Sequence, residues 1–74
     1  MADEPTSDFK VDTVKYGALR DAHLQVFLNG QNITAIHVPT GISVEADTRG
    51  TADANWELAQ EALQQAIEHR LGSQ

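Results

Sequence analysis

Apolar and polar residues alternate along a stretch of the chain that two turn signals interrupt. The alternation runs through His23 to Leu28 and ends at Asn29-Gly30, a pair that suits the two positive φ values of a type I′ hairpin. A second turn, at Val38 to Gly41, follows the next alternating run and precedes a third. The pattern therefore predicts a three-stranded antiparallel meander.

The turns also predict the register, and the register predicts the two faces of the sheet. With Asn29-Gly30 as the loop, Val26 is expected opposite Ile33. The second turn places Ala35 opposite Val44. One face is then apolar: Leu24, Val26, Leu28, Ile33, Ala35, Ile42 and Val44. The other face is mostly polar: His23, Gln25, Phe27, Asn32, Thr34, Ile36, Ser43 and Glu45. Such alternation is typical of an antiparallel sheet that is covered on one side only.

A long amphipathic helix is predicted over residues 53–71. Thr51 or Asp53 offers the N-cap, and Gly72 suits the position just past the C-terminus. Apolar residues recur at helical spacing: Trp56, Ala59, Leu63 and Ile67, continued by Arg70 and widened by Ala62, Ala66 and Leu71. The outer face is polar: Glu57, Gln60, Glu61, Gln64, Gln65 and Glu68. This helix is expected to cover the apolar face of the sheet.

The chain before the meander carries weaker signals. Phe9, Val11 and Thr13 alternate with polar residues, which predicts a further half-buried strand over 9–16 with a bulge or end near Thr13. Residues 1–7 are polar and are expected to form a disordered tail. The predicted fold is one α+β domain over 8–72, in which a small antiparallel β-meander of three to four strands packs on one C-terminal amphipathic helix.

Composition narrows the function classes. The chain has 74 residues, no cysteine and a net charge of −6, with only five basic side chains. Because those five are scattered, no basic face for nucleic acid is predicted. No apolar run approaches the roughly 20 residues of a membrane span, and the acidic N-terminus lacks the features of a signal peptide. A cytoplasmic protein is the expectation.

No catalytic or metal chemistry is predicted. The absence of cysteine excludes a thiol nucleophile, and no serine lies in a nucleophile motif. His23, His37 and His69 lack the close spacing of metal ligands, so neither a metal nor a cofactor is expected. His37 is interpreted as a strand-end histidine that hydrogen-bonds the turn after it. Trp56 is interpreted as a core anchor.

The segment His37 to Ile42 resembles the His-x-Pro-Thr-Gly-Ile turn in the catalytic domain of peptide-chain release factors. The likeness covers about residues 8–70. Within it, Asp8 to Thr13 resembles the opening strand of that domain, and Arg49 and Asn55 resemble an Arg and an Asn that precede its helix. The resemblance implies a related sheet-and-helix architecture and contact with the ribosome or tRNA.

The residues that would carry that family's hydrolysis are missing. A Gly-Gly-Gln tripeptide there positions the water that attacks the ester of peptidyl-tRNA, whereas Gly17 to His23 reads Gly-Ala-Leu-Arg-Asp-Ala-His. The resemblance therefore implies no retained hydrolase activity. A less specific resemblance to small HicB-type antitoxins rests on Asp47-Thr48 and the alanine-rich helix over 57–69.

Phe27 and Ile36 are the unusual residues of the polar face, because two apolar side chains on neighbouring strands can centre a binding patch. The candidate partner-binding residues are His23, Gln25, Phe27, Thr34 and Ile36. The open edges of the sheet are a second candidate. We therefore expect a non-enzymatic, acidic protein-binding module, inhibitor-like or antitoxin-like, that binds another protein or itself as a homodimer. The alternative is a release-factor-like domain that contacts ribosome or tRNA without hydrolysis.

Overall fold

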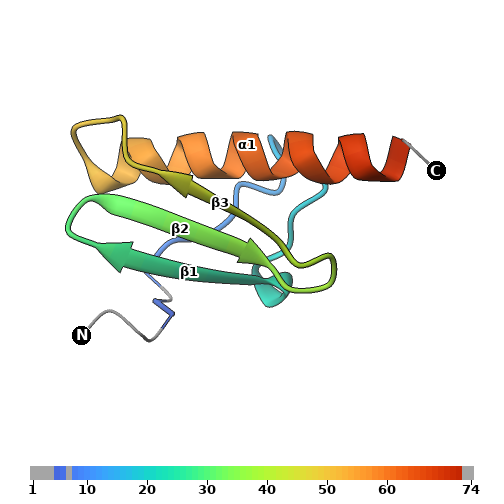
Figure 1. Ribbon diagram of the computed structural model, residues 1–74, viewed down its shortest axis with the longest axis horizontal. Helices are drawn as coiled ribbons and strands as arrows, with labels where there is room; N and C mark the ends of the chain where they lie inside the picture. The colour runs from blue at the N-terminus through green and yellow to red at the C-terminus, as the bar shows by residue number, and fades with distance from the viewer. Residues whose placement is uncertain (1–4, 7, 73–74) are drawn as a thin grey trace.

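The computed structural model describes residues 5–6 and 8–72, and Figure 1 shows its two layers. A short 3-10 turn, η1 (Asp21–His23), leads into three strands: β1 (Leu24–Asn29), β2 (Asn32–His37) and β3 (Ile42–Ala46). The helix α1 (Ala52–Gly72) follows and packs against β2 and β3. The predicted α+β fold is confirmed, with an antiparallel sheet in the order β1-β2-β3 and one C-terminal helix.

The first hairpin differs from the prediction in its turn and its register. Its loop is Gly30-Gln31, with Asn29 opposite Asn32, so that Val26 pairs with Ala35. Gly30 has φ +67°, and among the described residues only glycines have a positive φ, so the φ of Gln31 is negative. A positive φ at the first loop position alone is the type II′ pattern, which replaces the predicted type I′ turn. Because the register moved by two residues, each side chain keeps its predicted face.

The second hairpin has the predicted register, with His37 opposite Ile42 and Ala35 opposite Val44. The apolar face and the helical stripe meet in one core, as predicted. Its buried hydrophobic residues are Val11, Tyr16, Leu19, Val26, Ile33, Ala35, Ala46, Trp56, Ala59, Leu63 and Ile67. The interpretation of Trp56 as a core anchor is therefore confirmed.

The prediction of a strand over 9–16 was wrong. Residues 9–20 form no strand and instead run irregularly beside α1. Side chains take the place of a strand partner: the Val11 N–H donates to Asp21 Oδ1 at 2.8 Å, and the Asp12 carboxylate accepts from the N–H groups of Val14 and Lys15 at 3.2 Å each. An aspartate that bonds the backbone two and three residues onward favours a turn over a strand. The alternation nevertheless identified the buried Val11.

One stripe of α1 holds this irregular segment through polar side chains. Trp56, Gln60 and Gln64 follow each other at intervals of four residues and so share a face of the helix. Trp56 Nε1 donates to Lys10 O at 3.0 Å, and Gln60 Oε1 accepts from the Asp12 N–H at 2.9 Å. Gln64 Oε1 accepts from a backbone N–H of the same segment at 3.0 Å. The prediction that Gln60 faces solvent was wrong, because it is buried against this segment.

The loop before α1 is fixed by Thr51 and Asn55. Thr51 Oγ1 accepts from the Ala54 N–H at 3.2 Å, which makes Thr51 rather than Asp53 the N-cap. The fully buried Asn55 amide accepts from the Arg49 N–H at 2.9 Å and donates to the carbonyls of Gln31 and Arg49, at 2.5 and 3.3 Å. Asn55 thus ties the β1–β2 turn to the β3–α1 loop.

The predicted tail over residues 1–7 lies largely outside the described residues. Of its described part, Thr6 meets the outer edge of β1, where its N–H donates to Val26 O at 2.6 Å.

Candidate functional site

The face of the sheet that α1 leaves open brings together most of the predicted binding residues. The register pairs Gln25 with Ile36 and Phe27 with Thr34 on β1 and β2. On β3 the same rows continue, with Ser43 beside Ile36 and Glu45 beside Thr34. The result is a grid of two rows: Gln25–Ile36–Ser43 and Phe27–Thr34–Glu45. We call these six residues the open face.

Phe27 and Ile36 are the two apolar residues of the open face. They stand in different rows and are diagonal neighbours across β1 and β2, a separation that a large side chain spans. Both are half-buried, yet neither belongs to the hydrophobic core or to the partly buried residues around it. Among the described residues, neither Phe27 nor Ile36 therefore packs its side chain against α1. Glu45, on the edge strand, is the one charged residue of the open face.

His23 does not join the other predicted residues. It belongs to η1, where the two-residue period of a strand does not apply, and its ring lies edge-to-face against the His37 ring with 5.8 Å between centroids. His37 alternates with Ile33 and Ala35 and is buried on the helix-covered side. The structure therefore places His23 at the end of the sheet, beside His37.

His37 is held by the turn that follows it, as predicted. Its Nδ1 lies 2.8 Å from Thr40 Oγ1, and its carbonyl accepts from the Gly41 N–H at 2.8 Å. Arg70, near the end of α1, donates from Nη1 to Thr40 O at 3.2 Å. Burial, and to a lesser extent the nearby His23, lower the pKa of His37. The neutral imidazole is therefore the form that this turn accommodates.

The residues behind the release-factor resemblance thus have identifiable structural contacts. His37 and Thr40 close the second turn, and Gly41 has a φ of +74° there. Asn55 fixes the backbone of Arg49. These contacts give His37, Thr40 and Asn55 a structural role in the fold.

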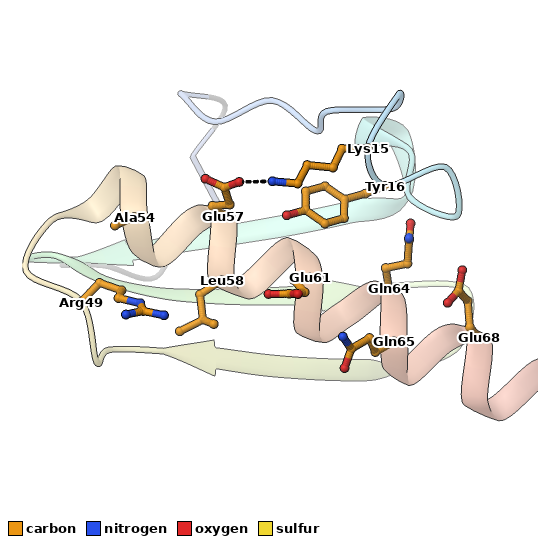
Figure 2. A pocket seen from close by; sticks show the side chains of 10 residues that line it. All are labelled: Lys15, Tyr16, Arg49, Ala54, Glu57, Leu58, Glu61, Gln64, Gln65 and Glu68. Carbon is orange, nitrogen blue, oxygen red and sulfur yellow. Dashed lines mark hydrogen bonds and ion pairs between the residues drawn. The ribbon is translucent and has the colours of Figure 1, made fainter.

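A groove of about 700 Å³ runs along the outer side of α1, away from the open face (Figure 2). Its wall includes Glu57, Glu61 and Glu68, with Lys15 and Tyr16 on one side and Arg49 on the other. Lys15 and Glu57 form an ion pair, which raises the pKa of Lys15. Both side chains are more than half exposed, so the pair adds little stability.

The exposure of two valines was not predicted from the sequence. Val14, at the tip of the turn after Asp12, is 96% exposed, and Val38 in the second turn is 55% exposed. Single exposed apolar residues are common on protein surfaces, and nothing in the pattern of the sequence distinguishes these two.

Among residues 5–6 and 8–72, no group of three or more His, Asp or Glu side chains gathers as a metal site would require. Within the same part of the chain, no helix has the length and apolar character needed to cross a bilayer.

Comparison with protein-family models, with curated proteins and with solved structures finds no match to this chain.

Proposed function

We propose that this protein is a non-enzymatic binding module that docks another protein on the open face of its sheet. The observation that supports this most strongly is the position of Phe27 and Ile36, which lie together outside the core. Two neighbouring apolar residues, bordered by Gln25, Thr34 and Ser43 and by the charged Glu45, form the kind of apolar patch with a polar rim that protein interfaces use.

The chemistry of the face indicates what the partner presents. An apolar side chain of the partner would rest on Phe27 and Ile36, and hydrogen-bonding groups would meet Gln25 and Thr34. Glu45 at the β3 rim favours a lysine or arginine of the partner. The net charge of −6 extends this preference, because it speeds the approach of a basic partner at low salt. An inhibitor or antitoxin-like regulator of a basic protein fits these features.

A release-factor-like domain that contacts ribosome or tRNA without hydrolysis is the second candidate. The observation in its favour is that the residues carrying the resemblance all have defined contacts: His37 with Thr40 in the second turn, and Asn55 with Arg49 in the loop before α1. Against it, Lys15 and Arg49 lie on opposite sides of α1 and form no common basic face (Figure 2). Phosphate recognition depends on such a face.

The test is affinity capture from lysate of the source organism with three forms of the tagged chain. The forms are the wild type, the Phe27→Ser/Ile36→Ser double variant, and Val14→Ser as the matched control. Val14→Ser also replaces an exposed apolar side chain by serine, but it lies away from the open face. Circular dichroism and the fluorescence of Trp56 verify that all three forms are folded. Both protein and RNA are identified in the captured material.

We expect a stoichiometric protein that the wild type and Val14→Ser retain and the double variant loses. A protein that the folded double variant captures equally well would contradict docking on the open face. Recovery of ribosomal proteins or tRNA at moderate salt, independent of Phe27 and Ile36, would instead support the second candidate.

A further inference from the structure

The outer edge of β3 is open, whereas the outer edge of β1 is partly occupied. In the order β1-β2-β3 both outer strands have one unpaired edge. On β1, Thr6 donates its N–H to Val26 O. Within the described residues, no backbone hydrogen bond from outside the sheet reaches Ser43 to Ala46. Figure 2 shows β3 as the outermost strand of the sheet.

The register identifies which backbone groups of β3 point outward. A two-residue hairpin loop is closed by a hydrogen-bonded pair, here Asn29 and Asn32. Since hydrogen-bonded and non-bonded pairs alternate, residues 32, 34 and 36 of β2 bond to β1, and residues 33, 35 and 37 bond to β3. Their partners on β3 are residues 42, 44 and 46. Ser43 and Glu45 therefore direct their N–H and C=O groups away from the sheet.

β3 has few of the features by which edge strands usually resist pairing. Its sequence Ile-Ser-Val-Glu-Ala contains no proline and no lysine, and Glu45 is its one charged residue. Its pairing with β2 runs without interruption from Ile42 to Ala46, so no bulge twists the edge away. Ile42 and Val44 are only partly buried, and Leu58 of α1 points toward β3 and is also partly buried (Figure 2). The apolar margin of the core is thus incompletely covered along this strand.

We propose that β3 is a self-association edge, at which a second copy of this chain adds its own β3 in an antiparallel register centred on Val44. In that register the five residues of β3 pair completely with themselves. Val44 meets Val44 of the second copy, Ile42 meets Ala46, and Ser43 meets Glu45. Because the backbone N–H and C=O groups of Ser43 and Glu45 point away from the sheet, Ser43 and Glu45 form the hydrogen-bonded pairs between the two copies.

Charge separates this register from its neighbours. Centring the pair on Val44 places each Glu45 opposite an uncharged serine, whereas centring it on Glu45 would place two carboxylates face to face. Centring it on Ser43 would bring Glu45 opposite Gly41, outside the strand. Because β3 pairs with itself without opposing two charges, a second copy satisfies the outward backbone groups of both edges at once, which gives a two-fold dimer.

This proposal is independent of docking on the open face, because an edge contact leaves that face free. The dimer would have a six-stranded sheet with two copies of Phe27 and Ile36 on one side. A chain that dimerises, but whose Phe27→Ser/Ile36→Ser variant still captures the partner, supports the edge contact alone. A chain that stays monomeric, but whose Phe27→Ser/Ile36→Ser variant loses the partner, supports docking on the open face alone.

The test is sedimentation equilibrium of the whole chain at micromolar to millimolar concentration, with Ser43→Glu, Ser43→Lys and Ser43→Ala. In the proposed register Ser43→Glu faces Glu45 of the other copy twice, and Ser43→Lys makes two opposite-charge pairs. Each cross-strand charge pair changes pairing modestly, so two together should shift the dimer dissociation constant between about twofold and thirtyfold. Within one chain residue 43 lies beside Ile36, so neither charge meets a charged partner on β2.

We expect the wild type and Ser43→Ala to dimerise alike, Ser43→Glu to dimerise more weakly, and Ser43→Lys more tightly. High salt should reduce both differences. A chain that stays monomeric at every concentration overturns the proposal. A dimer whose dissociation constant is unchanged by the charge at position 43 overturns it as well, because association then occurs elsewhere.

Discussion

Asn55 fixes two loops at once, and its replacement by alanine should destabilise the protein more than any exposed change on α1. Its side chain is fully buried and makes three hydrogen bonds, one accepted from the Arg49 N–H and two donated to the carbonyls of Gln31 and Arg49. A hydrogen bond contributes a net 0.5–1.5 kcal/mol, so three should contribute about 3 kcal/mol. For a domain of this size the whole free energy of unfolding is roughly 4–11 kcal/mol. Asn55→Ala should therefore remove about a quarter of it or more.

Urea denaturation followed by the fluorescence of Trp56, the single tryptophan, measures this loss. The matched control is Gln65→Ala, an exposed position on the same helix, which should change the free energy of unfolding by less than about 0.5 kcal/mol. Asn55→Asp is the second variant. It keeps the shape of the side chain but places a carboxylate oxygen, instead of the amide nitrogen, next to the carbonyls of Gln31 and Arg49. A cost below about 1 kcal/mol for Asn55→Ala would refute the reasoning, since the loops would then be fixed without this amide.

Three further predictions concern other contacts of the fold. Because the pKa of His37 is lowered in the folded state, the unfolded chain binds more protons at this residue. The contribution of His37 to stability should therefore be constant above about pH 6.5 and decrease as the pH falls below it. Denaturation of wild type and His37→Gln between pH 7.5 and 5 should show a smaller loss of stability in the variant. Gln60→Ala should cost about 1–2 kcal/mol and speed amide hydrogen exchange at Asp12, whereas unchanged exchange there would contradict the contact. Gly41→Ala should cost about 1–2 kcal/mol in urea denaturation, because φ is +74° and the added methyl group meets no atom; an equal or higher stability would contradict this.

The sequence was sufficient for the sheet, its faces and the helix, because each has a regular period. Alternation placed Val26, Ile33 and Ala35 in the core, and helical spacing placed Trp56 and Leu63 there. The register of the first hairpin was not determined, since a shift of two residues moves no side chain to the other face. Asn-Gly suits more than one turn, so the sequence left the loop position ambiguous.

Long-range polar contacts account for the parts that were predicted wrongly. Alternation over residues 9–13 identified Val11 as buried, but the hydrogen-bond partners of that segment are the side chains of Asp21, Gln60 and Gln64, which only the folded chain brings near. A glutamine on a helix gives no local sign that a distant backbone will meet it. These contacts moved Gln60 from the expected outer face to the interior.

The candidate site was predicted in part for the same reason. The two-residue period of the strands places four of the candidate residues on one face: Gln25, Phe27, Thr34 and Ile36. His23 does not join them, because the 3-10 turn begins before the strand and directs its ring toward His37.

Docking on the open face is tested most directly by mapping the amide chemical shifts of the isotope-labelled protein as its captured partner is added. Docking on the open face predicts that the largest changes fall on Gln25, Phe27, Thr34 and Ile36 and that Phe27→Ser/Ile36→Ser abolishes them. Changes concentrated on Glu57 and Glu61 along the outer groove, with the open face unaffected, would contradict it.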